Sequence, residues 1–96
     1  MVVEFLTFEV VTSEQSDWLA VEEGVWSRFL EQQPGFVRKE MWRPPGRANT
    51  IHAVIWWETR EEWKAITPER VATVDRRMAD WLRHPTCVEY EVVREG

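Results

Sequence analysis

The sequence has little cysteine, little glycine and no excess of positive charge, and each shortage excludes a class of protein. Its one cysteine, Cys87, cannot form an internal disulfide, which is typical of proteins of the reducing cytoplasm. The four glycines are too scattered to form a phosphate-binding loop. The 12 Lys and Arg against 17 Asp and Glu give a net charge of −5, which argues against nucleic acid and anionic membranes as partners.

Long apolar runs are missing as well. No stretch approaches the roughly 20 apolar residues of a membrane-spanning helix, and the N-terminus lacks the basic segment of a signal peptide. No spacing of His, Cys, Asp or Glu indicates a metal site, and no cofactor-binding motif occurs. The 96 residues suffice for one compact domain, which we expect to span residues 1–96. The residue type in excess is tryptophan, which occurs seven times.

Hydrophobic periodicity predicts the element order β-α-β-β-α-β. Segments rich in β-branched and aromatic residues are predicted as strands: residues 2–11, 36–43, 50–57 and 87–93. Segments with helical spacing lie between them: residues 12–33, 59–66 and 67–84. This order is that of the ferredoxin-like fold, an α+β arrangement in which an antiparallel sheet carries its helices on one face.

The helix starts carry capping signals. Thr12 with Gln15 and Thr59 with Glu62 have the spacing of capping boxes. Thr67 precedes a proline at the first helical position, which is a further start signal. These signals place the helix starts directly after the first and third strands.

The first helix is expected to bury only one side. Trp18 and Trp26 lie on its apolar side, whereas Glu22, Glu23 and Arg28 lie on the opposite side. The tryptophans should therefore pack in the core and the charged side chains should face solvent.

The strands carry large apolar groups on both sides, which a sheet with one solvated face would not do. In the first strand Leu6 and Phe8 point one way, and Val3 and Phe5 point the other. Each large apolar side chain left in water forgoes about 1.5–3 kcal/mol of stability. We therefore expect a homodimer in which two copies pack sheet against sheet.

The second face also carries polar groups, so it is either a ligand cavity or a dimer interface with satisfied ion pairs. The predicted ligand-binding residues are Thr7, Arg38, Glu40, Trp42, Trp56 and Trp63. His52 on this face is the candidate catalytic base for a phenol, and the alternative is a hydrogen-bonded interface histidine. Trp63 is expected to act as a lid, while Arg38 and Glu40 either orient a ligand or pair with each other.

The strings EQQPGFVRKEMW and AVIWWETREEWKAI resemble the antibiotic biosynthesis monooxygenase-like family, most specifically in Pro34-Gly35-Phe36 and Trp57-Glu58-Thr59. The resemblance covers nearly the whole chain and implies a homodimeric α+β barrel with a pocket between sheet and helices or inside the barrel. It also implies a cofactor-free monooxygenase acting on an aromatic or other small apolar substrate. A non-catalytic small-molecule-binding barrel and a purely structural dimer are the alternatives.

The haem-degrading branch of this family is disfavoured. Members of that branch carry an Asn-Trp-His set. The matching positions in this sequence are Thr7, Ile66 and either Val74 or Asp75. None of the three residue types is retained, so we do not expect haem degradation.

Overall fold

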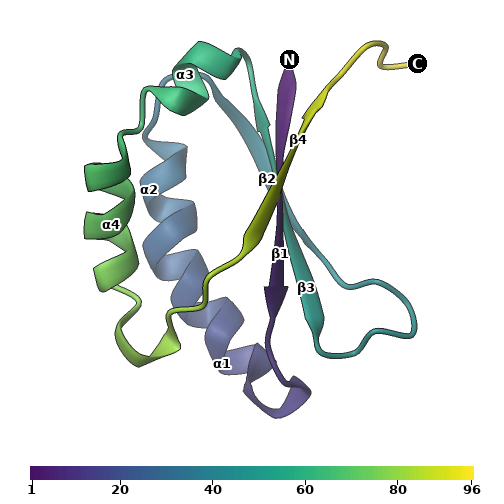
Figure 1. The fold of residues 1–96 in the computed structure, drawn as a ribbon, viewed down its shortest axis with the longest axis vertical. Coiled ribbons are helices and arrows are strands. Elements are labelled where there is room, and N and C mark those ends of the chain that lie inside the picture. Colours follow the sequence, from purple (N-terminus) through teal and green to yellow (C-terminus); the bar gives the residue numbers. More distant parts are fainter.

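The computed structural model describes residues 1–96 as a four-stranded antiparallel sheet with helices on one face only (Figure 1). The strands are β1 (Val2–Glu9), β2 (Phe36–Trp42), β3 (Thr50–Trp57) and β4 (Thr86–Glu91). Their spatial order is β2-β3-β1-β4, so β1 and β3 are the central strands. The prediction of a ferredoxin-like α+β fold is confirmed.

The helices, in chain order, are α1 (Thr12–Glu22), α2 (Arg28–Glu31), α3 (Arg60–Lys64) and α4 (Pro68–Arg76). A π-helical turn, Glu23–Ser27, joins α1 to α2 in one continuous helical segment (Figure 1). A 3₁₀ turn, Ala79–Trp81, follows α4, which is shorter than the predicted helix because Ala79 adopts a left-handed φ of 51°. No helix combines the length and the hydropathy needed to cross a bilayer.

Two predicted helix caps are confirmed. The Thr59 hydroxyl accepts a hydrogen bond from the Glu62 N–H at 3.1 Å. The Thr67 hydroxyl accepts one from the Arg70 N–H at 3.2 Å. Both threonines satisfy an amide that the first helical turn leaves without a partner.

The predicted capping box at the start of α1 is wrong. The buried Gln15 side chain donates to the carbonyl oxygens of Val10 and Ala48, at 2.8 and 2.6 Å. The Thr12 N–H is instead bound by the Asn49 side chain at 3.0 Å. The loop before β3 thus supplies contacts that a local sequence pattern assigned to the helix itself.

The core lies between the sheet and the helices. Trp18 of α1 and Trp57 of β3 are both 0% exposed in this layer. Trp18 packs against Phe8 of β1, with 4.8 Å between the ring centroids. The opposite face of the sheet has no helix over it, so the side chains there are the ones left for another surface to cover (Figure 1).

Gly35, in the turn before β2, has a φ of 85°, and a Cβ there would lie 2.6 Å from the Glu62 side chain. We expect Gly35→Ala to lower the free energy of unfolding by about 1–2 kcal/mol through backbone strain alone. The collision with Glu62 should add to that loss. Gly46→Ala is the matched control, since its φ is 80° and no atom lies within 4 Å of the added Cβ. Equal losses for the two variants in chemical denaturation would contradict this expectation.

Candidate functional site

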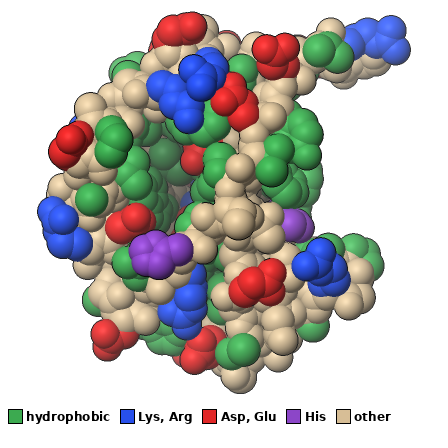
Figure 2. Space-filling model, in the orientation of Figure 1, with side chains coloured by type: hydrophobic (Ala, Val, Ile, Leu, Met, Phe, Trp, Pro, Cys, Tyr) green, Lys and Arg blue, Asp and Glu red, His purple; other side chains and the backbone are tan.

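A cavity of about 550 Å³ lies between the sheet and the helices. Its walls are mainly apolar and aromatic, and include Leu6, Phe8, Trp18, Trp26, Leu30, Ile55, Trp63 and Met78. Figure 2 shows the hollow, with apolar side chains inside it and acidic and basic side chains around it. The volume lies within the roughly 300–1,000 Å³ typical of small-molecule sites.

Glu4 is the acidic residue that β1 contributes to this cavity. Its carboxylate accepts a hydrogen bond from the indole N–H of Trp57 at 3.1 Å. Burial raises the pKa of the Glu4 carboxyl, and the Trp57 hydrogen bond and the charges of Lys64 and Lys39 offset this only in part. Glu4 therefore keeps its proton to a higher pH than an ordinary glutamate does.

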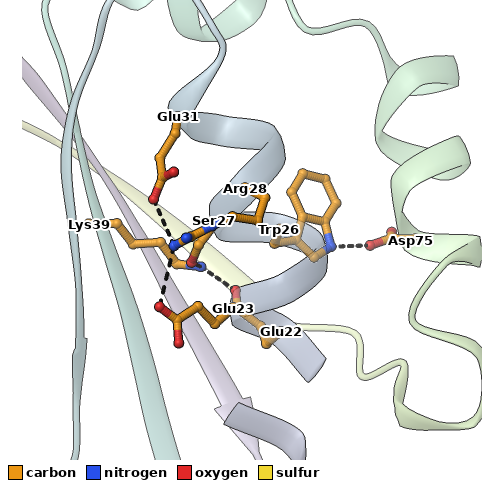
Figure 3. Close-up of polar contacts among 8 residues, drawn as sticks. All are labelled: Glu22, Glu23, Trp26, Ser27, Arg28, Glu31, Lys39 and Asp75. Atoms are coloured by element: carbon orange, nitrogen blue, oxygen red, sulfur yellow. Dashed lines mark hydrogen bonds and ion pairs between the residues drawn. The ribbon is translucent and has the colours of Figure 1, made fainter. Parts of the chain in front are cut away.

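A second carboxyl–indole pair lies on the helical side of the cavity. The Trp26 indole N–H donates to Asp75 at 3.1 Å and so connects the π turn to α4 (Figure 3). Burial raises the pKa of Asp75, opposed by this hydrogen bond and by the charge of His84. The cavity thus has a carboxyl group with a raised pKa on each of two walls.

Glu22 and Lys39 form a buried ion pair beneath the π turn (Figure 3). Their side chains are 5% and 6% exposed, and the Lys39 ammonium also donates to the Ser27 hydroxyl at 2.8 Å. Burial lowers the pKa of Lys39, while the charge of Glu22 opposes that shift. Glu22 also lines the cavity. Its negative charge there is neutralised by the Lys39 ammonium.

The burial of Glu22 corrects the prediction that it faces solvent. In an α-helix, residues five apart differ by about 140° around the axis. In the wider π turn, residues five apart lie on the same side of the helix. The side chains of Glu22 and Ser27 therefore both reach Lys39. Glu23 and Arg28, predicted on the same polar side, are exposed and form an ion pair at 3.3 Å.

Trp18 also lines the cavity, and its indole N–H is buried without a hydrogen-bond partner. An unpaired buried donor costs about 1–3 kcal/mol. A ligand with an acceptor atom at this end of the cavity could supply the missing partner.

Six of the seven predicted site residues lie together on the other face of the sheet: Thr7, Arg38, Glu40, Trp42, His52 and Trp56. The strand register places Thr7 and Trp42 opposite His52 from its two sides. The Thr7 hydroxyl is 3.1 Å from the Nδ1 of His52. The Phe5 ring lies against the imidazole, with 4.6 Å between centroids.

Arg38 and Glu40 pair with each other at 3.2 Å, which is one of their two predicted roles. The Arg38 guanidinium lies 3.8 Å from the ring centroid of Trp56, and Glu40 accepts a hydrogen bond from the Trp42 indole at 2.9 Å. These contacts connect four predicted residues into one network, but the network lies on the side of the sheet away from the cavity.

Trp63 is not with the other six. It is 8% exposed, packs with Leu30 and Trp57 in the core, and lines the cavity. Because α3 turns toward the helical side of the sheet, Trp63 cannot cover His52 as a lid (Figure 1). It is instead part of the cavity wall.

The sequence prediction missed Glu4, although a signal was present. Glu4 alternates with Leu6 and Phe8, so it shares their side of β1. An acidic residue in an otherwise apolar, core-facing alternation indicates a buried carboxyl, and buried carboxyls with a specific partner are candidate functional groups.

The sequence matches no protein-family model and no curated protein. Solved structures do match it. The haem degrader MhuD of Mycobacterium tuberculosis, solved with two haems in its active site, is 23% identical, with a TM-score of 0.78 over 100% of this chain and 99% of that one. SnoaB of Streptomyces nogalater, a cofactor-independent oxygenase, is 19% identical, with a TM-score of 0.66 over 98% of this chain and 94% of that one.

A Streptomyces coelicolor monooxygenase in complex with nanaomycin D is 17% identical, with a TM-score of 0.76 over 99% of this chain and 88% of that one. The chain has the fold of the antibiotic biosynthesis monooxygenases. This agrees with the ferredoxin-like fold of the single chain, whereas the homodimeric barrel that the resemblance implied stays a prediction. At such low identity the likeness establishes the architecture, so the chemistry has to be argued from this chain's own residues.

Proposed function

We propose that the protein is a cofactor-independent monooxygenase that holds an aromatic or other small apolar substrate between its sheet and its helices. The observation that carries the proposal is the cavity of about 550 Å³, which combines aromatic walls with the carboxyl groups of Glu4 and Asp75. The fold shared with a cofactor-independent oxygenase supports it. The proposed compartment is the reducing cytoplasm, in keeping with the single free cysteine.

A phenolic substrate suits a protein without a cofactor, because a phenolate is electron-rich enough to react with dioxygen directly. One oxygen atom of O₂ becomes a new ring carbonyl and the other leaves as water. The two hydrogens of that water come from the hydroxyl group and from the ring carbon that is oxidised. The protein's task is to hold the ring, exclude bulk water and move protons.

We also propose that two copies pair through the exposed face of the sheet. Trp42, Val88 and Tyr90 on this face are 43%, 47% and 54% exposed. A face with this many exposed apolar groups is typical of a protein–protein contact. The interface would include His52, whose role as a base or as an interface histidine stays a prediction.

Filling the cavity should weaken both substrate binding and turnover. We expect Leu6→Trp to weaken binding of a naphthol, measured by calorimetry, by about tenfold or more, the equivalent of about 1.4 kcal/mol. Oxygen uptake with a panel of phenols and naphthols should fall with it. Val93→Trp adds the same ring at a residue that is 90% exposed and should change neither quantity. Naphthol binding without oxygen uptake by the unaltered protein would identify a non-catalytic binding protein instead.

A further inference from the structure

We propose that Glu4 is the acid–base residue of the cavity, taking the proton of the substrate hydroxyl and returning protons to the oxygen atom that leaves as water. This inference rests on the proposed function and deepens it by assigning the proton transfers to one side chain. It is carried by the position of Glu4, by the way its carboxylate is held, and by the groups around it.

Glu4 lies in a strand that is hydrogen-bonded on both sides. It lies in the central strand β1, paired in register with Ile55 of β3 and Glu89 of β4. Its Oε1 accepts the hydrogen bond from Trp57, a residue that is itself 0% exposed. Its Oε2 makes no hydrogen bond within the chain. One carboxylate oxygen is therefore fixed, and the other is left for a ligand in the cavity.

The other carboxyl groups of the cavity are less suited to this role. The Glu22 carboxylate is already paired with the Lys39 ammonium, so it is not free to bind a ligand hydroxyl. Asp75 is less deeply buried than Glu4 and lies near the C-terminal end of α4, where the charge of His84 acts on it. Glu4 is the carboxyl that combines depth, a neutral hydrogen-bond partner and a free oxygen.

The surroundings of Glu4 leave it a stronger base than an exposed glutamate. The titratable groups facing it from neighbouring elements are Lys39 of β2, Lys64 of α3, and Cys87 and Glu89 of β4. Glu89 is already paired with Arg60 at 2.7 Å, so its charge is largely neutralised. Burial raises the pKa of Glu4 by more than the charges of the two lysines lower it. The pKa is therefore shifted toward the pH at which a general base works best.

The proton transfers balance as follows. The Glu4 carboxylate takes the hydroxyl proton, and dioxygen adds to a ring carbon of the phenolate to form a C–O bond. Glu4 then protonates the outer oxygen of this peroxide. The ring carbon loses its hydrogen as a proton to Glu4, the O–O bond breaks, and the departing hydroxide takes that proton to leave as water. Glu4 ends as a carboxylate, and dioxygen is the only oxidant.

The test is Glu4→Gln, in which an amide oxygen can still accept the Trp57 hydrogen bond but cannot take a proton. We expect kcat for oxygen uptake with a naphthol to fall by about 10²–10⁴-fold, while the Kd for the naphthol changes little. The wild-type rate should rise as the pH passes the raised pKa of Glu4, and the variant should lack that rise. Glu91→Gln, an exposed acid on β4, should behave as wild type.

The stability of the variant gives a check on its folding. Because the pKa of Glu4 is raised in the folded protein, the folded state binds this proton more tightly than the unfolded chain. Wild-type stability should therefore fall as the pH rises from the ordinary glutamate pKa through the raised one. The Glu4→Gln variant should lack the part of this decrease that comes from Glu4. At neutral pH it should be at least as stable as the wild type.

The two proposals can fail separately. A Glu4→Gln variant with the wild-type rate and pH profile would overturn the role of Glu4 and leave the monooxygenase proposal standing. If the wild type consumes no oxygen, the monooxygenase proposal fails. The role of Glu4 as a base is then tested by the absorption spectrum of bound naphthol. A naphtholate band that is present in the wild type and lost in Glu4→Gln supports the role of Glu4 as a base. A wild-type spectrum without a naphtholate band overturns that role.

Discussion

Replacing Lys39 with methionine is expected to lower the free energy of unfolding by about 3–5 kcal/mol, because it leaves the Glu22 carboxylate buried without its partner. The two side chains are 5% and 6% exposed, so water cannot replace the missing ammonium group. Urea denaturation at neutral pH measures the loss.

The double variant Glu22→Gln with Lys39→Met is the matched control. It removes both charges and keeps side chains of similar size, so most of the lost stability should return. A loss of less than about 1 kcal/mol in Lys39→Met alone would equal that of an exposed pair, and would contradict the buried position of this one.

Placing a charge at Phe5 is expected to convert the proposed homodimer into monomers. Phe5 lies in the middle of the exposed face, with ring centroids 4.6 Å from His52, 6.3 Å from Trp42 and 6.0 Å from Tyr90. Phe5→Asp would bury an unpaired carboxylate in the interface. The dimer dissociation constant should rise by about 100-fold, or about 2.7 kcal/mol, and by more if the interface closes tightly.

Light scattering at micromolar concentration distinguishes the states, since one chain has a mass of 11.5 kDa. Val93→Asp is the control, because Val93 is 90% exposed and lies beyond the last strand. A wild-type protein with the mass of a single chain would contradict the dimer before any variant is made.

The strands and most helix starts could be predicted because they depend on local chemistry. Alternation along β1 and β3 assigned each side chain to a face, and Thr59 and Thr67 cap their helices through contacts only three residues away. The α1 start could not be read in this way, because its contacts come from Ala48 and Asn49, far along the chain.

The cavity could not be placed from the sequence for a related reason. Alternation shows which side chains share a face, but not how far the helices stand from the sheet. That spacing depends on how bulky groups such as Trp18, Trp26 and Trp63 pack together, which is a property of the assembled layers. The predicted residues around His52 therefore share one face of the sheet, as alternation indicated, while the cavity of the single chain lies on the opposite face.

The π turn at Glu23–Ser27 can also be described as one surplus residue in a helix that is otherwise regular. Deleting Gly24 would restore an uninterrupted α-helix in which Glu22 and the present Ser27 are four residues apart, and therefore still on one side of the helix. Trp18 and Trp26 would then be seven residues apart, as would Glu22 and Leu30, and seven residues of an α-helix return to within about 20° of the same side. The π turn thus takes up one additional residue within a single turn, and both halves of this helix keep the same side toward the cavity.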